Sequence, residues 1–137
     1  MRNAPVVLAV TAAAFACLDL AHKATAEATY VHPRSAAYVV VVLGLALLWS
    51  AAVLATRSAL LALAGGVVLG GALGNVVSLA LWPGVPNPIE LDAIAFNLAD
   101  AFVLLGFATT AAATLTFAGR NRERLREPLQ EGFRQPS

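Results

Sequence analysis

Charged residues are scarce in this sequence. Asp, Glu, Lys and Arg make up 12% of the 137 residues, about half of the roughly 25% that is typical of a soluble domain. Hydrophobic residues make up 59%, and they are gathered into long runs, as a chain that crosses a bilayer requires. The composition therefore indicates a membrane protein and excludes an ordinary soluble domain.

Cysteine is almost absent, and neither sign of charge dominates. Cys17 is the single cysteine, so the chain cannot form an internal disulfide framework or a multi-cysteine metal site. The formal net charge is +1, which gives no indication of a polyanionic partner such as nucleic acid. His22 and His32 lie in a polar loop without a cluster of carboxylates or cysteines, so we expect no metal ion, and we expect no cofactor.

Four apolar stretches have lengths that suit membrane-spanning helices. They cover residues 4–18, 36–55, 59–82 and 93–118, and the first is short unless it extends to His22; a spanning helix needs about 20 apolar residues. Lipid offers the backbone no hydrogen-bond partner, so each stretch should be helical. The sequence thus predicts an all-α membrane domain of four transmembrane helices over residues 1–119, and a charged cytoplasmic tail over residues 120–137.

Lys and Arg are distributed unevenly about these helices. If both termini share one side, that side carries seven of them, and the opposite side carries Lys23 and Arg34. Cytoplasmic segments hold the excess of Lys and Arg, so both termini are predicted to be cytoplasmic, in a multi-pass protein of the cell membrane.

A cleaved secretory signal is the alternative interpretation of the N-terminal segment. Residues 14–16 have the A-x-A pattern of a cleavage site. Only Arg2 supplies charge before the apolar run, and Phe15 is bulky for a lipoprotein-type site. Cleavage would also leave three helices, so the four-helix interpretation is preferred.

The few polar residues of the predicted helices gather near one depth, at the outer ends of three helices. They are Asp19, His22 and Lys23 on the first, Asn75 and Ser78 on the third, and Asp92, Asn97 and Asp100 on the fourth. Ionisable groups are costly in a bilayer and are therefore functional candidates. Asn75 and Ser78 share a helix face at a spacing of i, i+3, as do Asn97 and Asp100. We expect these four side chains to converge.

Structural roles are the competing interpretation of several of these residues. Asp19 and Lys23 have the spacing of an interfacial ion pair. Asp100 is suited to capping its helix, although its place about two turns into the apolar run favours a site. Asp92 is expected in the wet outer loop, and the stripe of glycines at 66, 70 and 74 is typical of close helix packing.

Three segments resemble the lipoprotein signal peptidase family, also called signal peptidase II. The segments from Asp19 to Lys23, from Gly70 to Asn75 and from Phe96 to Asp100 are similar to the family's D-x-x-[ST]-K, G-G-A-x-G-N and F-N-x-A-D. The resemblance implies a four-helix aspartic endopeptidase that removes the signal peptide of a prolipoprotein just before its diacylglyceryl cysteine. It implies membrane lipid and that peptide as partners, and binding roles for Asp19, Lys23, Asn75 and Asn97.

The resemblance breaks at one of the two catalytic aspartates that it implies. Asp100 is retained, and the other position falls on Ser78. An aspartic dyad needs two carboxylates that divide the roles of acid and base, and a serine hydroxyl cannot supply the second. Asp92 or Asp19 is a substitute only if the fold brings it within hydrogen-bond reach of Asp100.

The sequence therefore predicts a signal peptidase II-like membrane protein with impaired proteolysis. Two alternatives remain open: a non-catalytic binding protein for lipidated peptides or lipids, and a small transporter or accessory subunit. A second carboxylate near Asp100 favours an enzyme, and its absence favours a binding protein. A transporter would more often show repeated or broken helices.

Overall fold

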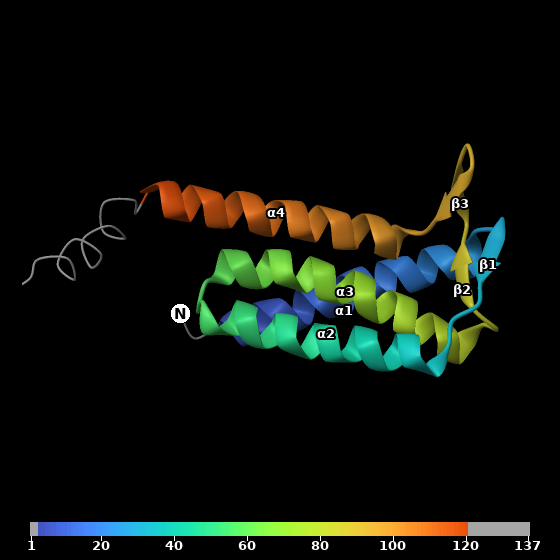
Figure 1. The fold of residues 1–137 in the computed structure, drawn as a ribbon, viewed down its shortest axis with the longest axis horizontal. Helices are drawn as coiled ribbons and strands as arrows, with labels where there is room; N and C mark the ends of the chain where they lie inside the picture. Colours follow the sequence, from blue (N-terminus) through green and yellow to red (C-terminus); the bar gives the residue numbers. More distant parts are fainter. Residues whose placement is uncertain (1–2, 121–137) are drawn as a thin grey trace, which may run out of the picture.

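Four long helices make up most of the computed structural model, which describes residues 3–120 (Figure 1). α1 spans Ala4–Thr25, α2 Ala36–Ala55, α3 Ala59–Leu81 and α4 Leu98–Arg120. All four are long and apolar enough to cross a membrane. The predicted fold of four transmembrane helices is confirmed, whereas the predicted tail beyond residue 120 lies outside the described residues.

Four short strands lie together at one end of the bundle, which we call the strand end (Figure 1). β1 (Tyr30–His32) pairs with β2 (Val85–Asn87), and β3 (Ile89–Leu91) pairs with β4 (Ile94–Phe96), both antiparallel. The sequence does not predict these short strands, which are additional to the four predicted helices. Prolines at 83, 86 and 88 keep this connection out of a helix, and strand pairing satisfies backbone groups of the connecting segments.

α4 begins later than the apolar run suggests. Residues 94–96 form β4, and the helix starts at Leu98, because a short apolar run does not distinguish a strand from a helix. Asp100 consequently lies in the first turn of α4 and not two turns inside it. At the other connection, α1 continues past His22 to Thr25.

α3 is the central helix and packs against the other three. Glycine allows this close approach: a Cβ added at Gly66 or Gly70 would lie 2.6 Å or 2.7 Å from atoms of α1. A Cβ at Gly71 would collide with Ala99 at the start of α4. The helix-packing interpretation of the glycine stripe therefore agrees with the structure, since such stripes bring transmembrane helices together.

Large apolar side chains cover the outside of the bundle. Leu47 and Leu48 on α2 are 72% and 70% exposed, and Leu104 on α4 is 72% exposed. So much exposed apolar surface would be a liability in water, but it suits a lipid environment. The chain is therefore a multi-pass membrane protein, in which α2 and α4 present broad faces to lipid.

We predict that a reporter fused after Ser137 will be found in the cytoplasm, because seven Lys and Arg residues lie on the side of the termini and two on the other. Paired alkaline phosphatase and fluorescent-protein fusions measure this. The same reporters inserted at Gly84, at the strand end, are the control and should show the opposite location. A periplasmic or extracellular C-terminus would contradict the topology.

Candidate functional site

Lys23 is a buried cation near the strand end of α1, with 4% of its surface exposed. Its Nζ donates to Oδ2 of Asp19 at 2.6 Å, to Oδ1 of Asn75 at 2.8 Å and to Oγ of Ser78 at 3.0 Å. An ammonium group has three donors, so all of them are used. The expected Asp19–Lys23 ion pair is therefore present, and it is buried in the bundle, where Lys23 joins α1 to α3.

Asp19 connects the same network to α4. Its Oδ2 pairs with Lys23, and its Oδ1 accepts a hydrogen bond from the backbone N of Ala99 at 2.9 Å. A carboxylate is favoured there, because the first turn of a helix carries partial positive charge. Asp19 is 0% exposed and both its oxygens are occupied. It makes no hydrogen bond to Asp100 within the described part of the chain, which argues against Asp19 as a substitute for the missing carboxylate.

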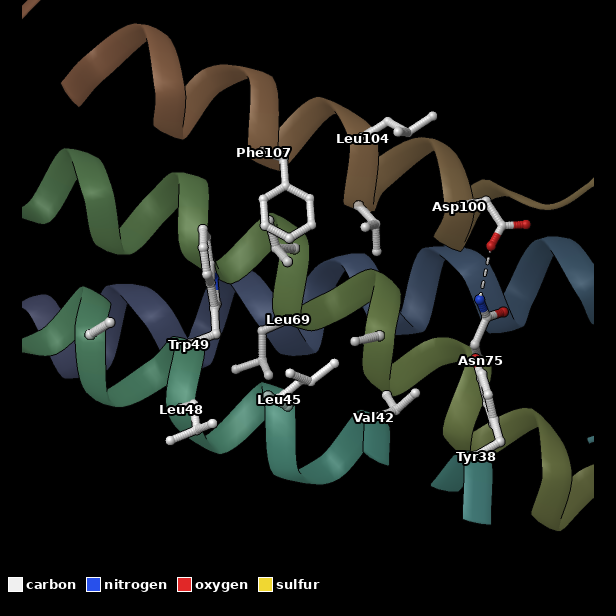
Figure 2. Close-up of a pocket in the computed structure, with 15 residues that line it drawn as sticks. Tyr38, Val42, Leu45, Leu48, Trp49, Leu69, Asn75, Asp100, Leu104 and Phe107 are labelled. Atoms are coloured by element: carbon white, nitrogen blue, oxygen red, sulfur yellow. Dashed lines mark hydrogen bonds between the residues drawn. The ribbon is translucent and has the colours of Figure 1, made fainter. Parts of the chain in front are cut away.

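Asn75 carries the network from Lys23 to Asp100. Its Oδ1 accepts from Lys23, and its Nδ2 donates to Oδ1 of Asp100 at 3.1 Å (Figure 2). Because the ammonium group can only donate, Lys23 determines which end of the amide faces α4. Asn75 thereby presents a donor to the Asp100 carboxylate.

Asp100 also caps α4. Its Oδ2 accepts from the backbone N of Asn97 at 3.2 Å, and Oδ1 of Asn97 accepts from the backbone N of Asp100 at 3.1 Å. This reciprocal pair is a capping box, in which two otherwise free backbone donors are satisfied. The capping interpretation of Asp100 thus agrees with the structure, and the same half-buried carboxylate also contacts Asn75.

Ser78 faces α1 and not Asp100. Its Oγ accepts from Lys23 and donates to the carbonyl oxygen of Gly74 at 2.7 Å, and the residue is 0% exposed. Within residues 3–120, no hydrogen bond joins Ser78 to Asp100. The four residues expected to converge do belong to one network, but Ser78 reaches Asp100 only through Lys23 and Asn75. This geometry does not support position 78 as the second half of a dyad.

Asn87, in β2, is linked to Asp100 through Asn97. Its Oδ1 accepts from Nδ2 of Asn97 at 2.6 Å, and Asn97 in turn bonds to Asp100. Asn87 is 8% exposed and lines a cavity together with Asp100. The sequence reasoning missed Asn87 because it lies between two prolines in a connection, where only the pairing of β2 with β1 would have placed it.

Two cavities meet at Asp100. The first, which we call the apolar cleft, has a volume of about 740 Å³ and lies between α2 and α4, over α3 (Figure 2). Asn75 and Asp100 lie at its strand end. Trp49 and Phe107 lie at the opposite end, with ring centroids 4.9 Å apart. Its other lining residues are Tyr38, Val42, Leu45, Ala46, Leu48, Ala52, Val68, Leu69, Ala72, Val103 and Leu104.

The second, which we call the polar cavity, has a volume of about 490 Å³ and lies among the strands. Asp92 lines it from the exposed β3–β4 turn, where its φ of 52° is in the left-handed region. Asp92 therefore shares this cavity with Asp100, although no hydrogen bond joins them within residues 3–120. The other lining residues are Thr29, Tyr30, His32, Arg34, Asn87, Glu90, Ala93 and Ala95.

The fold and this site define a polytopic membrane protein in which one half-buried carboxylate, Asp100, lies at the mouth of an apolar cleft, which is its strand end. The sequence profile described as signal peptidase (SPase) II matches residues 11–116. The chain belongs to this family, and the resemblance seen in its motifs is confirmed. Searches of curated proteins and of solved structures found no match.

Gly74 offers a direct test of the packing beneath the site. A Cβ at this position would lie 2.5 Å from Oδ2 of Asp19, whereas nothing lies within 4 Å of a Cβ at Gly44. We expect Gly74→Ala to lower the free energy of unfolding by about 1–3 kcal/mol, as overpacking usually does. Unfolding in mixed micelles measures this, with Gly44→Ala as the matched control. Equal stability of the two variants would argue against the close approach of α1 and α3.

Proposed function

We propose that this protein binds the lipid-modified segment of prolipoproteins in its apolar cleft, and that hydrolysis of the signal peptide is impaired or lost. One observation carries the proposal: the described hydrogen bonds join Asp100 directly to Asn75 and Asn97, and through Asn97 to Asn87, but directly to no second carboxylate. The cleft accounts for binding, and the missing carboxylate accounts for the loss of hydrolysis.

The shape and position of the apolar cleft support the binding of lipid chains. Its volume of about 740 Å³ falls in the range of roughly 300–1,000 Å³ typical of ligand sites. Its walls are α2 and α4, the two helices with broad lipid-exposed faces. Acyl chains can therefore reach it from the bilayer without crossing water. Family membership adds that related chains act on lipid-modified substrates.

The chemistry of the amides supports the loss of hydrolysis. In an aspartic dyad, one carboxylate takes a proton from the attacking water while the other protonates the carbonyl oxygen. A side-chain amide neither accepts nor releases a proton at neutral pH, so Asn75, Asn87 and Asn97 can orient Asp100 but cannot share its work. Glu90 and Asp92 are carboxylates, but they lie on the exposed side of the polar cavity.

A transporter has less support. Broken helices are typical of transporter sites, whereas each of the four helices in the described chain is continuous. Asp19, Lys23 and Ser78 are also buried, and they line neither the apolar cleft nor the polar cavity.

Binding and cleavage can be measured on one sample. We expect the purified protein in nanodiscs to bind a synthetic prolipoprotein peptide with a diacylglyceryl cysteine, and to yield no cleaved product by mass spectrometry. The same peptide without the lipid should bind much more weakly. Ala46→Trp, which fills the cleft from α2, should weaken binding. Failure to bind the lipidated peptide would contradict the proposed binding role. Cleavage that Asp100→Asn abolishes would contradict the proposed loss of hydrolysis.

A further inference from the structure

We infer that the preferred ligand of the cleft is the N-terminus of a processed lipoprotein, in which a diacylglyceryl cysteine carries a free α-ammonium group. The inference rests on the proposed function and specifies its ligand. The acyl chains would occupy the apolar cleft, and the ammonium group would pair with Asp100. The site would thus favour the product of signal-peptide removal over the precursor.

Among the described residues, Asp100 has no cation in direct contact. It is the only acidic or basic residue among the described residues that line the apolar cleft. Its two oxygens accept hydrogen bonds from the neutral Asn75 amide and from the backbone of Asn97. Lys23 is the nearest cation in this network, but Asp19, Asn75 and Ser78 occupy its three donors. Carboxylates at membrane depth usually have a charged partner or serve a functional site.

The surroundings of Asp100 add further negative charge. Glu90 and Asp92 line the polar cavity with it, against Arg34 as the one permanently charged base there. The Arg34 guanidinium lies over the Tyr38 ring, 4.8 Å from its centroid. Within residues 3–120 the one ion pair is Asp19–Lys23, so none of these carboxylates is paired. The mouth of the cleft therefore favours a cationic headgroup.

Signal-peptide removal creates a headgroup with this chemistry. In the precursor, the cysteine nitrogen belongs to a peptide bond and is neutral. In the product it is a primary amine, which is largely protonated at neutral pH. The same residue carries the diacylglyceryl thioether, so the charge stands directly at the head of the acyl chains. A phospholipid amine is less suitable, because its phosphate would bring a further negative charge to Glu90 and Asp92.

The test compares two synthetic diacylglyceryl-cysteine peptides of identical sequence, one with a free N-terminus and one N-acetylated. Binding is measured by surface plasmon resonance on the full chain in phosphatidylcholine nanodiscs. We expect the free amine to bind at least about tenfold more tightly, which corresponds to roughly 1.4 kcal/mol. Asp100→Asn should remove this preference, and Asp100→Glu, which keeps the carboxylate, should retain part of it. Glu27→Gln, an exposed change outside both cavities, should leave the preference intact.

Other results would overturn the inference in distinguishable ways. Equal affinity for the two peptides would refute the role of the charge while leaving the proposed function standing. Binding of neither peptide would refute both. If nanodiscs containing phosphatidylethanolamine abolish the binding of the free-amine peptide, the site takes a membrane aminolipid and the identification as a lipoprotein terminus is wrong.

Discussion

Replacing Lys23 with methionine is expected to lower the free energy of unfolding by about 3–5 kcal/mol, the usual cost of removing one partner of a buried ion pair. The change leaves Asp19 charged and 0% exposed with no cation beside it. It also removes the donor that Asn75 and Ser78 share. Unfolding in mixed micelles, followed by helical circular dichroism, measures the loss.

A double variant separates the charge from the packing. Asp19→Asn with Lys23→Met removes the unpaired charge but keeps an acceptor for the backbone N of Ala99, which Asp19 serves at 2.9 Å. It should therefore be more stable than Lys23→Met alone. His22→Leu, next in sequence, is the control for disturbance of α1. A Lys23→Met protein as stable as the wild type would show that the pair does not hold α1 to α3.

This network explains why the polar residues meet where they do. Lys23 orients Asn75, and Asn75 donates to Asp100. Asp100 caps α4. Asp19 accepts a hydrogen bond from the backbone N of Ala99, the second residue of the same helix. Three helices are thus joined at the strand end by side chains that have few other acceptable partners in lipid. Asp19 and Lys23, expected from the resemblance to bind ligand, line neither the apolar cleft nor the polar cavity, and their binding role stays a prediction.

The sequence predicts the helices well because the bilayer imposes a simple rule. Long apolar runs must be helical and must be about 20 residues long, and the observed bounds of α2 and α3 agree with the predicted runs within a residue. The sequence does not predict the strands. They pair segments far apart in the chain, such as Tyr30 with Asn87, and strands of three residues leave no periodic pattern.

The site is predicted less completely than the fold. The i, i+3 spacing correctly places Asn75 and Ser78 on one face of α3, but it does not reveal which neighbouring helix each side chain meets. Asn75 reaches α4, whereas Ser78 meets Lys23 of α1. Asn87 is invisible to periodicity, because its place depends on the β1–β2 pairing. A motif fixes residue types along one helix, and only the packing decides which of them face each other.

The wild-type chain is expected to fail to replace signal peptidase II in cells depleted of that enzyme. Losing one member of a catalytic unit lowers the rate by about a thousandfold or more. Asp100 is bonded to Asn75 and Asn97, and their amides cannot serve as the second catalytic carboxylate. Expression should be verified by immunoblotting. The readout is the accumulation of the unprocessed prolipoprotein that carries the diacylglyceryl group.

Asn87→Asp is the single change that we expect to restore processing. The substituted carboxylate would keep the acceptor that Asn97 uses at 2.6 Å, and no hydrogen bond in the described structure uses the amide donors it would lose. Positions 87 and 100 would then both present carboxylates to the polar cavity, in addition to the exposed Glu90 and Asp92. One could take a proton from water while the other donates a proton to the carbonyl oxygen.

Ser78→Asp is the matched comparison, because it adds the same group at the position that the motif suggests. Its carboxylate would face Lys23 and Asp19 rather than Asp100, so we expect no processing above the wild-type level. A rescue by Ser78→Asp, with Asn87→Asp inactive, would restore position 78 as the dyad site. Processing by the wild type that Asp92→Asn abolishes would identify Asp92 as a relocated catalytic carboxylate. Wild-type processing that survives Asp92→Asn but not Asp100→Asn would mean that one aspartate suffices, and the proposed loss of hydrolysis would be wrong.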